Sequence, residues 1–348
     1  MNSPHLLKSL VEETKGFGCT AFTIQSKDKV VFGRNFDFMI DYGHILVNKR
    51  NVSKTTLVSA SEKQFQWTSK FGSISFNQLG REFPYGGMNE SGFVIEQLWL
   101  DSTEYPHPDD RFGISVLQWI QYHLDTATTI NDVVDSDTFL RIIDDSGVNL
   151  HFFLSDKSGE SACIEFLNNK MVVVSKEELV VKALTNTSYQ ESIKGFCSSH
   201  IGKETYENPY TSNSFFRFEK TAKLLREFNS SYIDIVDYSF SILSSVKQAD
   251  YTQWSIVYDI SNLEIHFKSK TNQSIQTIQL NSLDFSSQTE SLFSEIRYLK
   301  FKEYSSKENF KLINQVFDSL DILKSIPKEI REVSSKYPES TIFNDNQV

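Results

Sequence analysis

Cys19 is the residue whose type and surroundings first suggest chemistry in this sequence. It opens a strand-like run over residues 19–24, and a short turn separates this run from Gly33-Arg34-Asn35-Phe36-Asp37. A hairpin would bring the thiol, the Arg34 guanidinium and the Asp37 carboxylate together, and these groups are the parts of a nucleophilic site. The alternative is a structural cysteine, because free cysteine is among the most commonly buried residues.

The composition of the 348 residues limits the classes of function. Hydrophobic residues make up 39% of the chain and charged residues 23%, as is typical of a globular protein with a large core. The net charge of −10 argues against nucleic-acid or anionic-membrane partners, because both present phosphate groups to the protein. We therefore expect a small-molecule ligand.

Cysteine usage and apolar runs give two further expectations. The cysteines are widely spaced and form no C-x-x-C pair, so we expect neither a disulfide framework nor a zinc cluster, and we interpret Cys163 and Cys197 as core residues. No apolar run approaches the roughly 18 residues of a membrane helix. Residues 1–18 mix leucines with charged residues and lack the uninterrupted apolar stretch of a secretory signal, so we expect a cytoplasmic protein.

Short strands interrupted by helices fill the chain to about residue 280. Runs of β-branched and aromatic residues bounded by turn residues predict strands over residues 19–25, 30–36, 92–100, 150–154, 163–166, 171–174, 254–259 and 263–267. Apolar residues three and four apart predict helices over residues 114–124, 218–225 and 233–243. This order predicts a mixed α+β protein with antiparallel sheets and argues against a doubly wound nucleotide fold.

The character of the sequence changes after residue 285. Ser305 and Glu308 match a capping box, and apolar residues at helical spacing follow at Phe310, Ile313, Phe317 and Leu320. We expect ordered structure to end near Pro327. The chain thus divides into residues 1–18, a domain over residues 19–285, and a C-terminal helical extension with a polar tail over residues 286–348.

The sequence resembles the choloylglycine hydrolase and penicillin V acylase family, a branch of the N-terminal-nucleophile (Ntn) hydrolases. The matching segments, in order, are Cys19-Thr20, Gly33-Arg34-Asn35-Phe36-Asp37, Gly87-Met88-Asn89-Glu90-Ser91-Gly92, Leu184-Thr185-Asn186, Arg217-Phe218 and Asp250-Tyr251-Thr252-Gln253-Trp254. Their order and spacing are more specific than any one of them. The resemblance covers about residues 19–280 and implies a four-layer αββα sandwich that hydrolyses linear amides. We expect no cofactor and no metal.

The resemblance implies that the nucleophile is the first residue of the mature chain. A free α-amine with a pKa of about 7.7–8.0 and a thiol with one of about 8.5 let one residue supply both nucleophile and base. Cys19 would attack an amide carbonyl and form a thioester, which water then hydrolyses. Arg34 would favour the thiolate, and Asp37 would orient the amine. Asn186 would donate to the oxyanion, and Arg217 would complete the charge network.

Two further residues are candidates for the oxyanion site or the pocket. Asn89 lies in Asn-Glu-Ser-Gly, where turn chemistry is the better explanation for it. Trp99 occupies the place of the family's second oxyanion contributor, where bile-salt hydrolases carry Asn and penicillin V acylases Tyr. Its backbone N–H could still donate to the oxyanion. The departure at Trp99 leaves the substrate open.

Aromatic residues near the motifs suggest a pocket for an apolar acyl group. The candidates are Phe36, Phe38, Tyr42, Trp67 and Tyr85, and the alternative for each is a core role. We therefore expect an N-acyl amide substrate with a lipophilic acyl part. A homo-oligomer is compatible with the sequence.

Cys19 has a free α-amine only when residues 1–18 are absent. These residues are a propeptide that the enzyme removes itself, or the start codon is misassigned, or they are an atypical export signal. The leading hypothesis is an amide hydrolase. The alternatives are an acyltransferase that passes the same thioester to an amine, and a noncatalytic binding protein on the same scaffold. Arg34, Asp37 and Asn186 together favour an enzyme, because a binding protein does not need all three.

Overall fold

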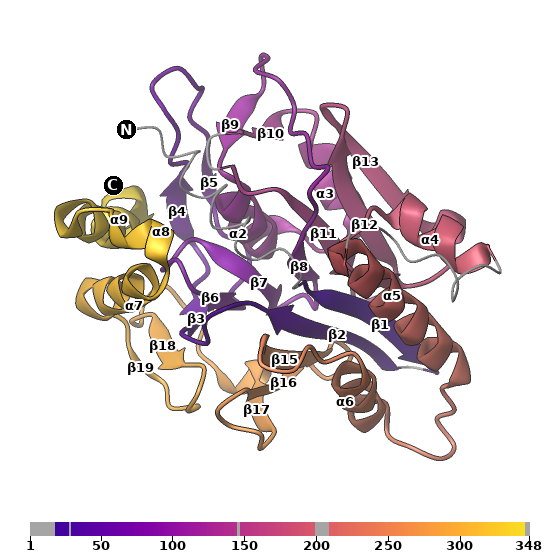
Figure 1. The fold of residues 1–348 in the computed structure, drawn as a ribbon. Helices are drawn as coiled ribbons and strands as arrows, with labels where there is room; N and C mark the ends of the chain where they lie inside the picture. Colours follow the sequence, from indigo (N-terminus) through magenta and orange to yellow (C-terminus); the bar gives the residue numbers. More distant parts are fainter. Residues whose placement is uncertain (1–17, 28, 145–146, 199–208, 345–348) are drawn as a thin grey trace.

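The computed structural model describes residues 18–27, 29–144, 147–198 and 209–344. Within these ranges, two large antiparallel sheets pack against each other, and helices cover their outer faces (Figure 1). This is the mixed α+β architecture with four αββα layers that the sequence predicts. The strand and helix order also agrees with the predicted order.

The first sheet carries the hairpin that begins at Cys19. Its strands in the described residues run in the order β14-β1-β2-β15-β16-β17. Their bounds are β1 (Thr20–Ser26), β2 (Lys29–Asp37), β14 (Ala183–Leu184), β15 (Thr252–Asp259), β16 (Glu264–Ser269) and β17 (Gln276–Gln279). Ala21 of β1 lies opposite both Arg34 and Leu184, and Thr252 lies opposite Asp37. Motifs that are far apart in the sequence therefore meet at one end of this sheet.

The second sheet is larger and packs against the first. In the described part of the chain its order is β13-β12-β11-β8-β7-β6-β3-β18-β19. The bounds are β3 (His44–Asn48), β6 (Ser73–Asn77), β7 (Pro84–Asn89), β8 (Val94–Trp99), β11 (Leu150–Ser155), β12 (Ser161–Leu167), β13 (Lys170–Ser175), β18 (Leu292–Glu295) and β19 (Lys302–Glu303). Smaller sheets pair β9 (Phe112–Ile114) with β10 (Leu140–Ile142), and β4 (Val52–Thr55) with β5 (Gln66–Thr68) and β20 (Ile342–Asn344).

Helices cover both outer faces. Against the first sheet lie α5 (Pro209–Glu227) and α6 (Ile235–Ser245), and α4 (Tyr189–Cys197) packs on α5. Against β7 and β8 of the second sheet lies α2 (Val116–Thr126), which α3 (Ile130–Ser136) follows (Figure 1). Short 3₁₀ turns occur at Lys176–Glu178 and Leu280–Ser282. Among the described helices, none has the length and apolarity needed to cross a bilayer.

The space between the sheets is filled by aromatic side chains. Phe32 lies 5.5 Å from Phe153 and 5.9 Å from Tyr258 between ring centroids, and all three are fully buried. Gly33 faces the ring of Phe22, and a Cβ at this position would lie 2.4 Å from Cζ of that ring. Only glycine therefore fits at the start of the Gly-Arg-Asn-Phe-Asp motif.

The C-terminal segment contributes strands as well as helices. Its strand β18 pairs with β3 in the large sheet, and α7 (Ser306–Ser319), α8 (Asp321–Lys324) and α9 (Lys328–Thr341) follow. The Ser305 hydroxyl caps α7 by accepting a hydrogen bond from the Glu308 N–H at 3.3 Å. The expectation that ordered structure ends near Pro327 is wrong, because α9 begins at the next residue.

The cysteine environments correct a second expectation. Cys163 is fully buried, as predicted, but Cys197 at the end of α4 is exposed. The core role predicted for Cys197 is therefore wrong, and the physical reason is its place at the outer end of a surface helix.

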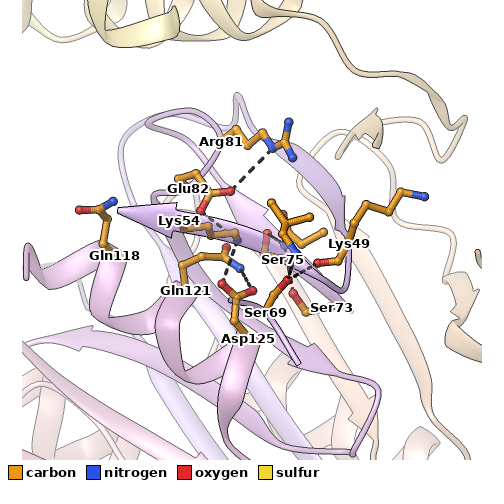
Figure 2. A network of polar contacts seen from close by, with 12 residues as sticks. Lys49, Lys54, Ser69, Ser73, Ser75, Arg81, Glu82, Gln118, Gln121 and Asp125 are labelled. Carbon is orange, nitrogen blue, oxygen red and sulfur yellow. Dashed lines mark hydrogen bonds and ion pairs between the residues drawn. The ribbon is translucent and has the colours of Figure 1, made fainter. Parts of the chain in front are cut away.

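A buried ion cluster joins three separate elements (Figure 2). The Lys54 ammonium on β4 lies 3.0 Å from Glu82 and 2.9 Å from Asp125 at the end of α2. Asp125 also accepts hydrogen bonds from the Trp67 indole and the Gln121 amide, both at 2.8 Å. Burial lowers the pKa of Lys54, but Asp125 and Glu82 outweigh it, and the net shift is upward. The cluster therefore links the small sheet to α2 with a charged lysine.

Candidate active site

Cys19 immediately precedes β1, and its thiol lies beside the buried Arg34 of β2. Cys19 is 5% exposed, and Arg34 Nη2 approaches its Sγ at 3.6 Å. Arg34 also donates to the Gln97 carbonyl at 2.9 Å, which fixes the direction of the guanidinium. Burial raises the pKa of the Cys19 thiol, the Arg34 charge lowers it, and the Asp37 carboxylate raises it again. The Asp37 backbone N–H lowers it further, but the net shift of this pKa is upward. Arg34 therefore stabilises the thiolate and offsets part of the effect of burial.

Glu96 is a member of the site that the sequence analysis missed. It forms a buried ion pair with Arg34 and accepts a hydrogen bond from the Tyr258 hydroxyl. Burial raises the pKa of Glu96 to about 7, against the opposing effects of Arg34 and Tyr258. Gly86 makes room for this side chain, since a Cβ there would lie 2.1 Å from Glu96 Oε2. The available signal was a carboxylate inside the mostly apolar strand predicted over residues 92–100.

Asp37 ends β2 and is held by two side-chain donors. The Thr252 hydroxyl donates to Oδ1 at 2.5 Å, and the Gln248 amide donates to Oδ2 at 2.6 Å. Burial raises the pKa of Asp37, while Arg217 and these two hydrogen bonds lower it. Gln248 also donates to the Gly18 carbonyl at 2.5 Å. It therefore connects the carboxylate to the peptide bond that precedes Cys19.

Asn186 follows β14 and lies between Trp99 and Arg217. Its Nδ2 donates to the Trp99 carbonyl at 2.9 Å, and its Oδ1 accepts from Arg217 Nη2 at 2.9 Å. Arg217 also donates to the Cys19 carbonyl and, at 2.9 Å, to the Thr20 hydroxyl. Burial lowers the pKa of Arg217, and Asp37 opposes this effect. These contacts fix the orientation of the Asn186 amide beside Cys19.

Gly18 occupies a space in which no larger residue fits. A Cβ at Gly18 would lie 1.9 Å from Asn186 Oδ1 and 2.3 Å from its Cγ. The Gly18 backbone therefore packs directly on the Asn186 amide, while its carbonyl is bonded to Gln248. The peptide bond before Cys19 lies among the same groups that surround the thiol.

A cavity opens at Cys19, and most of the predicted site residues line it. The lining includes Cys19, Asp37, Asn186, Trp99, Phe36, Phe38 and Tyr85. Arg34 and Arg217 are fully buried behind this wall and reach the site through the contacts given above.

Three predicted residues lie apart from this cavity among the described residues: Asn89, Tyr42 and Trp67. The Asn89 amide donates to the Leu124 and Ala127 carbonyls at 3.0 and 2.8 Å, and its oxygen accepts from the Ser91 and Phe93 N–H groups. This is the turn-forming role that the sequence favours for Asn89.

A buried group with metal-type ligands lies behind Asn186. Within the described residues, ligand atoms of His151, Cys163 and Glu165 lie within 4.8 Å of one another. His151 Nε2 is 2.8 Å from the Thr185 carbonyl, and Nδ1 is 3.1 Å from Glu165 Oε1. Because both ring nitrogens have protein partners, the arrangement fits a structural role. It holds the backbone immediately before Asn186.

Comparison with known proteins finds sequence relatives among amide hydrolases. A family model of linear amide C–N hydrolases, choloylglycine hydrolase family, matches residues 19–195, just over half of the chain. Penicillin V acylase from Pectobacterium atrosepticum is 26% identical over 267 residues, which cover 65% of this chain and 70% of that protein.

Solved structures show the same fold. Penicillin V acylase from Agrobacterium tumefaciens has a TM-score of 0.69 at 22% identity, and the match covers 82% of this chain and 98% of that one. A variant of conjugated bile acid hydrolase from Clostridium perfringens has a TM-score of 0.63 at 18% identity, covering 82% and 97%. The described part of the chain therefore has the same fold as these two structures.

Proposed function

Because this chain belongs to the choloylglycine hydrolase family of linear amide C–N hydrolases, we propose that it hydrolyses an N-acyl amide with Cys19 as the nucleophile. The observation that supports this most strongly is the convergence of four groups around Cys19. Arg34 approaches Sγ at 3.6 Å, Asp37 and Asn186 line the same cavity, and Arg217 binds both Asn186 and Cys19.

In the proposed reaction, the α-amine of Cys19 takes the proton from the thiol, and Sγ attacks the amide carbonyl carbon. The carbonyl oxygen becomes an oxyanion that the Asn186 amide stabilises. The C–N bond then breaks, the α-amine of Cys19 passes a proton to the leaving amine, and the acyl group remains as a thioester. Water attacks the thioester with the same α-amine as base, which releases the carboxylic acid and restores the thiol.

The α-amine requires cleavage of the Gly18–Cys19 bond, and the contact of Gln248 with this bond supports a reaction carried out by the chain itself. Sγ would attack the Gly18 carbonyl carbon, the C–N bond would break and leave a free α-amine, and water would hydrolyse the resulting thioester to the Gly18 carboxylate. Gln248, which donates to this carbonyl at 2.5 Å, would stabilise the oxyanion of that step. We therefore favour self-removal of residues 1–18 over the other two explanations of this segment.

The cavity supports a lipophilic acyl group. Aromatic and aliphatic side chains, among them Phe36, Tyr85, Leu117 and Leu150, dominate its lining. Apolar walls with a few polar groups at one end are typical of ligand sites that orient a substrate by its polar end. The polar end here contains Cys19 and Asn186, where the amide would lie.

The test is a turnover assay on purified protein. Its substrates are penicillin V, conjugated bile acids, N-acyl amino acids and N-acyl amines, and the readout is release of carboxylic acid. We expect hydrolysis by the wild type and by Cys197→Ser, whose cysteine is exposed and outside the described lining of the cavity, but not by Cys19→Ser. Full activity of Cys19→Ser would reject the nucleophile. Product ratios with and without added amine separate hydrolysis from acyl transfer.

A further inference from the structure

The cavity that begins at Cys19 is closed on one side by the C-terminal helices. Its lining includes Val316 of α7, Leu320 between α7 and α8, and Leu323 of α8. These residues follow the nucleophile by about three hundred positions in the sequence. The C-terminal segment is thus part of the same cavity as the reactive thiol.

These three side chains belong to a compact apolar cluster. Val316, Leu320 and Leu323 are at most 3% exposed and pack with Ile40 and Leu312. Phe38 and Leu79, which line the cavity as well, pack against the cluster. The cluster therefore continues from the C-terminal helices to the residues just after Asp37.

Buried polar contacts hold the C-terminal helices in place. Arg331 of α9 is 2% exposed and donates to the Leu323 and Ile326 carbonyls at 3.3 and 2.8 Å. Asn309 of α7 donates to the Ser335 carbonyl at 2.9 Å and accepts from the Arg81 N–H at 3.0 Å. These bonds connect α7, α8 and α9 to the loop that carries Leu79. The wall is therefore pre-formed, and a substrate can contact it without first ordering it.

The distribution of charged and apolar residues in the lining indicates which part of the substrate would contact the C-terminal helices. Its described charged members, Asp37 and Asp101, lie with the polar groups of the site: Asp37 binds Gln248, and Asp101 accepts from the Trp99 indole at 2.6 Å. Around Val316 and Leu320 the lining is apolar. An uncharged hydrocarbon chain would fit there without leaving a polar group unpaired.

We propose that α7 and α8 form the specificity wall of the acyl pocket, with Val316, Leu320 and Leu323 contacting the hydrocarbon part of the acyl chain and setting the length that is accepted. This inference rests on the proposed amide hydrolase function. The C-terminal segment would then take part in substrate choice, although it lies far from Cys19 in the sequence.

The test uses the full chain and a series of N-acyl derivatives of one amine, from acetyl to hexadecanoyl. Leu320→Ala removes part of the wall, and we expect kcat/KM for the best wild-type chain to fall about tenfold or more through KM. The optimum should move to bulkier chains, while the acetyl substrate is unaffected. Val316→Ala removes less volume and tests the same wall should Leu320→Ala fold poorly.

Ile313→Ala is the matched control, because Ile313 lies on α7, is 2% exposed, and is absent from the described lining. We expect it to lower stability without moving the chain-length optimum. Equal changes at every chain length in the wall variants, or the same shift in Ile313→Ala, would overturn the inference while leaving the proposed function intact. Absence of hydrolysis of every substrate by the wild type would reject both.

Discussion

At the scale of single residues, two side-chain amides have different proposed partners near Cys19: the Gly18 carbonyl for Gln248 and the substrate carbonyl for Asn186. Gln248 donates to the carbonyl of Gly18, whereas Asn186 lies beside the thiol at the cavity. We expect Gln248→Ala to slow removal of residues 1–18, and Asn186→Ala to lower turnover by about 10²- to 10³-fold with little effect on removal. Time courses of intact mass and acid release measure the two steps separately.

Gln253→Ala is the control for the first variant. Gln253 is also a buried amide close to Asp37 in the fold, but it donates to the Phe38 and Asp250 carbonyls. Equal effects of Gln248→Ala and Gln253→Ala on the removal of residues 1–18 would show that Gln248 acts only through packing.

Glu96 gives a prediction about pH. Its carboxylate balances the Arg34 charge above its pKa of about 7, so Glu96→Gln should leave more of that charge to stabilise the Cys19 thiolate. The pKa of Cys19 should therefore fall, and the pH profile of its alkylation by iodoacetamide should move to lower pH. Below pH 7 the difference should shrink, because the wild-type carboxyl becomes protonated. A profile that moves to higher pH would contradict this account.

Some residues of the candidate site could be predicted from the sequence, and others could not. Cys19, Arg34, Asp37 and Asn186 became candidates from the sequence because their neighbours form motifs. Gln248 has no such context, and its contact with Gly18 joins residues 230 positions apart. Glu96 was visible as a charge in an apolar strand, but its partner could not be named without knowing which strands face each other.

At the scale of elements, the strands were predictable and the contacts between remote segments were not. Residues 19–25 and 30–36 predict the hairpin that is observed as Thr20–Ser26 and Lys29–Asp37. The helix after Pro327 was missed because proline was interpreted as an ending. Proline is tolerated at a helix start, where its missing N–H needs no partner, and the Pro327 carbonyl accepts from Ile330 and Arg331 in the first turn of α9.

The ion cluster in Figure 2 gives a stability prediction for the elements it joins. Lys54→Met would leave Glu82 and Asp125 buried without their shared cation. We expect the free energy of unfolding to fall by about 3–5 kcal/mol in a urea titration. Lys223→Ala, which removes an exposed pair with Glu219, should change it by less than about 1 kcal/mol. Equal losses of unfolding free energy in both variants would mean that the buried cluster contributes no more to stability than an exposed ion pair.

At the scale of the whole molecule, residues that are about three hundred positions apart in the sequence line one cavity. In the proposed function, Cys19 just before β1 supplies the nucleophile, and α7 and α8 supply part of the apolar wall of its cavity. The acidic net charge is consistent with a small-molecule substrate. The fold class and the family could be predicted from motif order, whereas the role of residues 286–348 could not, because helical periodicity does not state which cavity a helix faces.

The central claim is that amide hydrolysis depends on Cys19 as an N-terminal residue. The most direct measurement is the intact mass and N-terminal sequence of purified protein whose amide hydrolysis has been measured on the same sample. If the proposed mechanism is correct, the active protein lacks residues 1–18 and begins at Cys19. Amide hydrolysis by protein that retains the Gly18–Cys19 bond would contradict it.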